Sequence, residues 1–93
     1  MIFLSPKEQE IVKNILAKYP YNFFVFGSRV KGTHRQFSDL DLGYRAIPER
    51  IIALIEGDFE ESDLPIKVDF VNLDRCSPEF LKYIEKDLIP LVL

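Results

Sequence analysis

Apolar residues recur along this chain at two spacings, which together predict a regular succession of helices and strands. The first helix begins at Ser5-Pro6-Lys7-Glu8, where a serine, a proline and a glutamate form a capping box. Pro20 ends this helix, because the residue before a proline is pushed out of the helical region. The apolar stripe in between has the helical repeat and comprises Ile11, Val12, Ile15, Leu16 and Tyr19.

Three segments are predicted to be strands. The run Phe23-Phe24-Val25-Phe26 is apolar on both faces, so we expect it at the centre of a sheet. From Asp39 to Tyr44, and again from Ile66 to Val71, apolar positions alternate with largely polar ones. This alternation indicates strands that bury one face.

Further helices are expected between and after these strands. A short one begins near Ser28, a second runs from Pro48 to a stop at Gly57, and a last one opens at Ser77. The acidic segment from Asp58 to Asp63 reads as a solvated connection. This order of elements predicts an α/β (α+β) fold, in which about four helices pack on a small mixed β-sheet, as a single domain over residues 1–93.

Composition and net charge narrow the possible binding partners and the cellular compartment of the protein. The 93 residues carry a net charge of −3, so we expect no direct DNA binding and no attraction to an anionic membrane. No apolar run approaches the ~20 residues that span a bilayer. Cys76 is the only cysteine, which excludes an internal disulfide and fits a reducing cytoplasm.

The candidate chemistry lies in a motif whose two halves are ten residues apart. Gly27-Ser28 ends the first strand, and Asp39-Leu40-Asp41 opens the second. Asp39 and Asp41 lie on the same face of their strand, with Cα atoms about 6.6 Å apart, and can converge on one or two cations. Two carboxylates and no nearby cysteine favour Mg²⁺ or Mn²⁺ over zinc. The two halves form one site only if their strands are neighbours.

Other residues near this motif have a functional and a structural interpretation. Asp69, on the third strand, is a third metal ligand or the base for an acceptor hydroxyl, and the alternative is a solvated carboxylate. The amides of Gly27 and Ser28 can bind phosphate oxygens. Arg29 and Lys31 supply positive charge for a triphosphate, unless Arg29 braces the loop and Lys31 is merely solvated.

Taken together, these residues resemble the DNA polymerase beta-like nucleotidyltransferase superfamily. Gly27-Ser28, the spacing of ten, Asp39-Leu40-Asp41 and Asp69 carry the resemblance. The short chain is similar to the minimal nucleotidyltransferase (MNT) group, the antitoxins of HEPN/MNT type VII toxin–antitoxin systems. The resemblance implies that Gly27 and Ser28 hold the triphosphate of ATP and that all three aspartates bind Mg²⁺, as two ions. Lys31 stands where the group often has arginine.

The same resemblance implies an activity and a partner. AMP would pass from ATP to a tyrosine hydroxyl of a HEPN-domain toxin and so neutralise it, which makes the chain a protein adenylyltransferase in a hetero-oligomer. Two other functions stay open at this stage. One is an antitoxin that acts by complex formation without catalysis, and the other is a nucleotidyltransferase whose acceptor is a small molecule or RNA.

Overall fold

The computed structural model describes residues 2–92, in which helices and strands alternate nearly as the sequence predicts. None of the helices in this range is long and apolar enough to cross a membrane. Two short 3-10 turns, at 73–75 and 85–87, flank the last helix. The helices and strands are α1 Pro6–Leu16, β1 Phe24–Phe26, α2 Ser28–Lys31, β2 Leu40–Tyr44, α3 Glu49–Glu60, β3 Val68–Asn72, α4 Pro78–Ile84 and β4 Ile89–Pro90.

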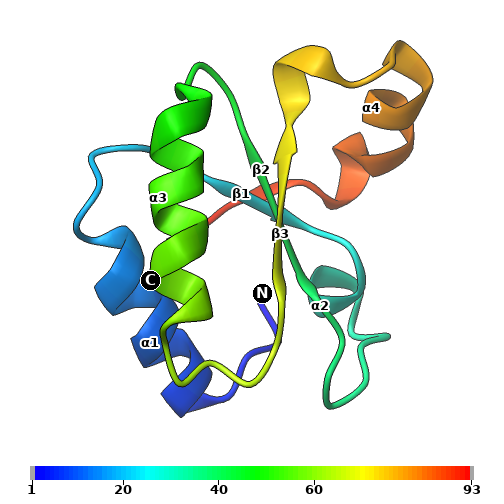
Figure 1. The fold of residues 1–93 in the computed structure, drawn as a ribbon. Helices are drawn as coiled ribbons and strands as arrows, with labels where there is room; N and C mark the ends of the chain where they lie inside the picture. The colour runs from blue at the N-terminus through cyan, green and yellow to red at the C-terminus, as the bar shows by residue number, and fades with distance from the viewer. Residues whose placement is uncertain (1, 93) are drawn as a thin grey trace.

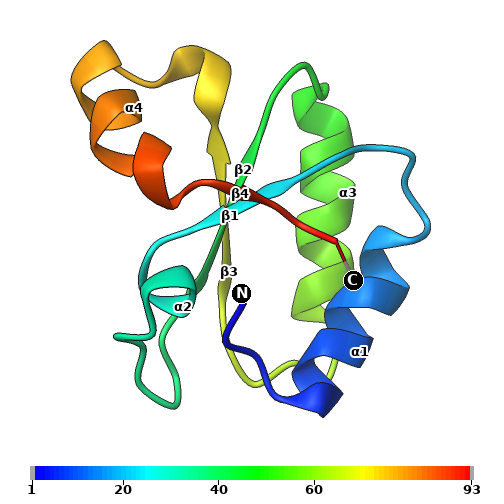
Figure 2. The same cartoon turned by 180° about the vertical axis from the view of Figure 1, so that it is seen from behind.

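Within residues 2–92 the four strands form one mixed sheet, in the order β3-β2-β1-β4. β1 runs antiparallel to β2 and β4, while β2 and β3 are parallel. The central place of β1 confirms what its two apolar faces predicted. The sequence did not predict β4, a two-residue strand beside β1 that is seen best from behind (Figure 2). Its Pro90 lacks an N–H group, which is tolerated at the edge of a sheet.

Helices flank both faces of the sheet (Figure 1). α1 and α3 lie on one side, and α2 and α4 lie on the other. The side of α1 and α3 holds the larger core, where Val25 and Leu42 are fully buried. The side of α4 holds a smaller core formed by Phe26, Leu73 and Ile84. This is the predicted α/β (α+β) fold, with a small mixed sheet packed between helices.

The start of α1 has the predicted capping box. The Ser5 hydroxyl accepts a hydrogen bond from the Glu8 amide at 3.1 Å, and the Ser5 amide donates to the Glu8 carboxylate at 2.8 Å. These two bonds satisfy backbone donors that an α-helix leaves without partners at its N-terminus. They also fix Glu8 at the place where α1 meets the candidate site.

α3 is longer than predicted, because it does not end at Gly57. The helix continues to Glu60, and its last turn buries Phe59 in the larger core. Burying an aromatic ring outweighs the roughly 1 kcal/mol that a glycine costs inside a helix. Asp58 therefore belongs to α3 and not to a solvated loop, and it accepts a hydrogen bond from the Tyr19 hydroxyl of α1.

The helical Gly57 leads to a stability prediction. A Cβ added at this position meets no atom within 4 Å. Gly57→Ala should therefore raise the free energy of unfolding by about 0.5–1 kcal/mol, since alanine loses less backbone entropy on folding. Urea denaturation followed by circular dichroism measures the change. An unchanged or lower stability would contradict the continuous helix.

Candidate active site

Strand register brings the Gly-Ser turn and two aspartates into one row across the sheet. Phe26, the last residue of β1, pairs with Asp41 of β2, and Asp41 pairs with Asp69 of β3. Residues paired in this way point to the same face of a sheet. Both carboxylates therefore lie on the face that α2 and α4 flank, and Gly27-Ser28 follows directly at the end of the row.

The backbone at Gly27 runs directly against the carboxylate of Asp41. Its φ of 86° lies in the left-handed region, which only glycine adopts without strain. A Cβ built on Gly27 would overlap the Oδ2 atom of Asp41. Both constraints require glycine here, and they place the turn in contact with the central carboxylate of the row.

The carboxyl group of Asp41 holds its proton unusually tightly. Burial is the main cause, and the negative charges of Asp69 and Asp39 add to it, so that the pKa rises from the usual 3.8 to about 6. The three carboxylates thus form one electrostatic cluster. A divalent cation among them would have the opposite effect on this pKa, because it stabilises the ionised form.

In this structure the three carboxylates are spread along one face of the sheet. Asp39 is exposed just before β2, and Oδ1 of Asp69 lies 3.3 Å from Nζ of Lys67. Among residues 2–92, no three Asp, Glu, His or Cys side chains converge closely enough to hold a metal ion. The like charges of the three aspartates repel one another. Their hard oxygen atoms fit Mg²⁺, which binds through a few carboxylates together with substrate phosphates.

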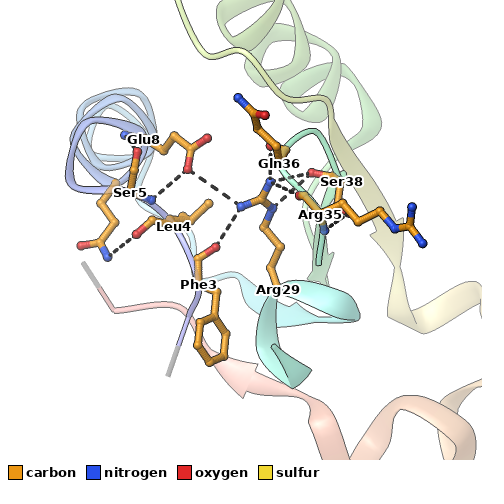
Figure 3. Close-up of polar contacts among 9 residues, drawn as sticks. Phe3, Leu4, Ser5, Glu8, Arg29, Arg35, Gln36 and Ser38 are labelled. Atoms are coloured by element: carbon orange, nitrogen blue, oxygen red, sulfur yellow. Dashed lines mark hydrogen bonds and ion pairs between the residues drawn. The ribbon is translucent and has the colours of Figure 1, made fainter. Parts of the chain in front are cut away.

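The guanidinium group of Arg29 donates its hydrogen bonds to backbone carbonyls, and the side chain is only 3% exposed (Figure 3). Its Nε and Nη2 atoms donate to the carbonyl of Ser38 at 3.1 and 3.0 Å. Nη2 also donates to the carbonyls of Arg35 and Gln36, and Nη1 donates to that of Phe3. We therefore correct the predicted nucleotide contact of Arg29, because this side chain braces the loop instead.

This network fastens the segment that joins the two halves of the motif. Ser38 immediately precedes Asp39, and its hydroxyl accepts a hydrogen bond from the Arg35 amide at 2.7 Å. Glu8 lies 3.9 Å from Nη1 of Arg29, which extends the network to the first turn of α1. The path of the chain into Asp39 thus depends on a buried cation that follows the Gly-Ser pair.

Lys31 lies at the edge of a cavity between α2 and α4. Its Nζ atom is 3.3 Å from Oδ2 of Asp87 and 5.5 Å from the centre of the Tyr83 ring. This cavity, the α2–α4 hollow, measures about 320 Å³. Three of the residues predicted to bind nucleotide share it, since it is lined by Gly27, Ser28 and Lys31 on one side and Phe80, Tyr83 and Asp87 on the other.

Comparison with known proteins identifies the family of this chain. The family described as "Polymerase beta, Nucleotidyltransferase" matches residues 10–92. The chain belongs to this family. It is a nucleotidyltransferase of the minimal, MNT type. A curated relative, "Probable protein adenylyltransferase MntA" of Haemophilus influenzae, is 38% identical over 90 residues, which cover 89% of this chain and 77% of the relative.

Sequence reasoning missed the part of this nucleotidyltransferase that α4 contributes. It gave no place in the site to Phe80 or Tyr83, whose side chains are 38% and 66% exposed. The available signal was their spacing, since residues three apart on a helix share one side. His34, by contrast, lies outside the carboxylate row and stacks on Phe3, with ring centres 5.4 Å apart.

The role of Arg29 can be tested with lysine, which keeps the charge but has only one nitrogen. Arg29→Lys should lower the free energy of unfolding by about 3 kcal/mol, because a single ammonium group cannot replace the several hydrogen bonds that the buried guanidinium group donates to these carbonyls. The control is Arg35→Lys at an exposed side chain, which should change stability by less than about 0.5 kcal/mol. Equal effects of the two substitutions, measured by chemical denaturation, would contradict the bracing role.

The raised pKa of Asp41 predicts a pH-dependent cost in stability. The native state holds the Asp41 proton more tightly than the unfolded chain does. The protonated carboxyl group therefore contributes its full share to the free energy of unfolding below pH 4, and this contribution is lost as pH rises through about 6. Asn cannot ionise, and Asp41→Asn should therefore stabilise the protein at pH 8 without divalent cations. Since Asp41 is only half-buried, solvent screening limits the gain to about 1–2 kcal/mol. A gain of the same size at pH 3.5 would contradict this explanation.

Proposed function

We propose that this protein is a Mg²⁺-dependent adenylyltransferase that transfers AMP from ATP to a hydroxyl group of a partner protein. The observation that carries the proposal is the row of Asp41 and Asp69 with the Gly27-Ser28 turn at its end, where a turn suited to phosphates contacts the carboxylate of Asp41. The name of the Haemophilus relative, a probable protein adenylyltransferase, supports AMP as the transferred group and a protein as the acceptor.

The Gly-Ser turn, Lys31 and the three aspartates each have a role in binding ATP. The backbone of Gly27 and the amide and hydroxyl of Ser28 bind oxygen atoms of the triphosphate. Lys31 shares the α2–α4 hollow with them and supplies positive charge near the leaving phosphates. Asp39, Asp41 and Asp69 would hold Mg²⁺, which when bound neutralises the triphosphate and the departing pyrophosphate.

The reaction is an in-line displacement at the α-phosphorus. The acceptor oxygen forms a bond to this phosphorus, and the bond to the oxygen that bridges the α- and β-phosphates breaks, so that pyrophosphate leaves. Asp69 accepts the proton of the acceptor hydroxyl. It is suited to this role because its side chain is 38% exposed on β3, a strand at the edge of the sheet. An acceptor that approaches from the β3 edge and a nucleotide on the α2 side would meet at the row.

For the acceptor we propose a tyrosine hydroxyl of a HEPN-domain toxin, which adenylylation neutralises. Tyrosine meets the chemical requirement, because its phenolic hydroxyl is a nucleophile that a carboxylate can help to deprotonate. The product of the adjacent gene is the partner to test first. On this proposal the protein acts as an antitoxin through catalysis and forms at least a transient complex with its target.

The decisive test removes two carboxylates and measures transfer. Asp39→Asn combined with Asp41→Asn should reduce AMP transfer by about 100-fold or more, since the charges that hold the cation are lost while the side-chain shapes remain. The assay incubates each variant with ATP, Mg²⁺ and the partner, and intact-protein mass spectrometry detects an AMP-sized increment on the partner. A matched control, Glu61→Gln with Asp63→Asn, removes two exposed carboxylates elsewhere and should transfer AMP normally.

Two results would contradict the proposal. If the Asp39/Asp41 variant still protects cells from the toxin as well as the parent does, neutralisation rests on binding and not on catalysis. If labelled ATP modifies a small molecule or RNA while the partner protein stays unlabelled, the acceptor class is wrong.

A further inference from the structure

The outer edge of β3 carries backbone groups that no other strand pairs with. β3 comes first in the order β3-β2-β1-β4, so within residues 2–92 only its inner edge has a neighbouring strand. The Leu40 amide donates to the Lys67 carbonyl at 2.9 Å, which sets the alternation of the parallel pair. Asp69 therefore bonds to β2, and the N–H and C=O groups of Val68 and Phe70 point outward. Figure 1 is seen from this edge, and no helix crosses β3 in that view.

A cavity of about 340 Å³, the β3–α3 cavity, lies along this edge between β3 and α3. Phe59 and Phe70 give it aromatic surface, with ring centres 6.0 Å apart. Glu56 and Glu60 add carboxylates from exposed positions on α3. Lys67 also lines the cavity, but its ammonium group lies 3.3 Å from the carboxylate of Asp69. The cavity thus combines apolar rings with two negative charges that Lys67 does not pair with.

The arrangement of the two glutamates is unfavourable without a positive charge beside them. They are four residues apart on α3, so they lie on the same side of the helix and repel each other. Glu60 is also the last residue of α3, where the helix dipole disfavours negative charge, and the last turn has no basic residue. None of the ion pairs among residues 2–92 involves Glu56 or Glu60. An arginine or lysine from another protein would relieve this repulsion, with its alkyl stem against the aromatic rings.

An extended basic segment of another protein fits this edge better than a second copy of the chain. Pairing two β3 edges would bring two identical acidic cavities together, and their like charges would repel. A basic strand instead pairs with the outward backbone groups of Val68 and Phe70 and also matches the charge of the cavity. Addition of a strand to a free sheet edge is a common mode of peptide recognition, in which backbone bonds give affinity and side-chain pockets give specificity.

We propose that the acceptor protein binds as an added strand on the outer edge of β3, with an arginine or lysine side chain of that strand in the β3–α3 cavity. This inference rests on the proposed transfer of AMP to a protein, and it adds how that protein docks. β3 then has two functions, since its inner edge places Asp69 in the carboxylate row and its outer edge holds the acceptor.

This docking mode places the acceptor hydroxyl. The residue opposite Asp69 on the added strand points to the same face of the sheet as Asp69. Its backbone lies two strand spacings from Asp41, or about 10 Å, so a long side chain such as tyrosine comes closer to the row than serine does. Successive side chains of a strand point to opposite faces. The basic residue in the cavity is therefore an odd number of positions from the acceptor residue.

Amide hydrogen exchange tests the added strand directly and without ATP. The isotope-labelled chain is mixed with an excess of the unlabelled product of the adjacent gene, and exchange is followed by NMR. The amides of Val68 and Phe70 should exchange about tenfold more slowly in the mixture than in the free protein, because they gain hydrogen-bond partners. The amides of Asp69 and Val71 are internal controls. They already bond to β2 in the free protein, so their exchange should change less.

Charge removal tests the basic side chain. Glu56→Gln combined with Glu60→Gln should raise the KM for the partner about tenfold in the AMP-transfer assay, because the attraction for a basic residue is lost. The kcat and the KM for ATP should stay within about twofold, since the carboxylate row is intact. The matched control is Glu10→Gln with Glu79→Gln, which removes two exposed carboxylates from α1 and α4 and should leave all three values unchanged.

The outcomes separate this docking mode from the proposed function. If the parent transfers no AMP to the partner, the proposed acceptor fails, and docking at β3 fails with it. If the partner is modified while Val68 and Phe70 exchange as in the free protein, the function stands but the acceptor docks elsewhere. Protection of these amides in the free protein that rises with its concentration would assign the edge to a second copy. A KM for the partner that the Glu56/Glu60 variant leaves unchanged would overturn the basic side chain in the cavity.

Discussion

The buried guanidinium group of Arg29 is the interaction on which the candidate site depends. A buried cation is tolerated only when its donors are satisfied, and here the satisfying groups are carbonyls of Phe3 and of the loop at 35–38. The loop therefore cannot relax without leaving a charge unpaired. Since that loop leads directly into Asp39, one arginine couples the N-terminal segment, the Gly-Ser turn and the carboxylates.

The sheet supplies the second constraint, because its register decides which groups meet. Asp41 lies on a central strand, with the Gly27 backbone on one side and Asp69 on the other. Burial in this position raises the pKa of Asp41, and the negative charges of Asp69 and Asp39 raise it further. The protein thus keeps three mutually repelling carboxylates near one another, an arrangement that is typical of a site that binds positive charge.

Much of this arrangement can be predicted from the sequence, because its signals are local. The capping box at Ser5 and Glu8 and the alternation around Asp41 depend on neighbouring residues alone. The predictions that were wrong concern residues whose environment is formed by other parts of the folded chain. Gly57 lies inside a helix because Phe59 is buried in the core. Arg29 is buried because the carbonyl of Phe3, near the start of the chain, and those of the loop at 35–38 surround it. The α2–α4 hollow could not be predicted from the sequence for the same reason, since α4 lies near α2 only in the folded chain.

The central claim is that the Gly-Ser turn and three aspartates form one metal-dependent nucleotide site. Its most direct test is a crystal structure of the protein with Mn²⁺ and the α,β-methylene analogue of ATP, with anomalous scattering locating the metal. The account predicts a Mn²⁺ peak coordinated by Asp41 and at least one of Asp39 and Asp69, with the phosphates on Gly27 and Ser28. A well-ordered nucleotide bound elsewhere, with no Mn²⁺ at Asp41, would contradict it.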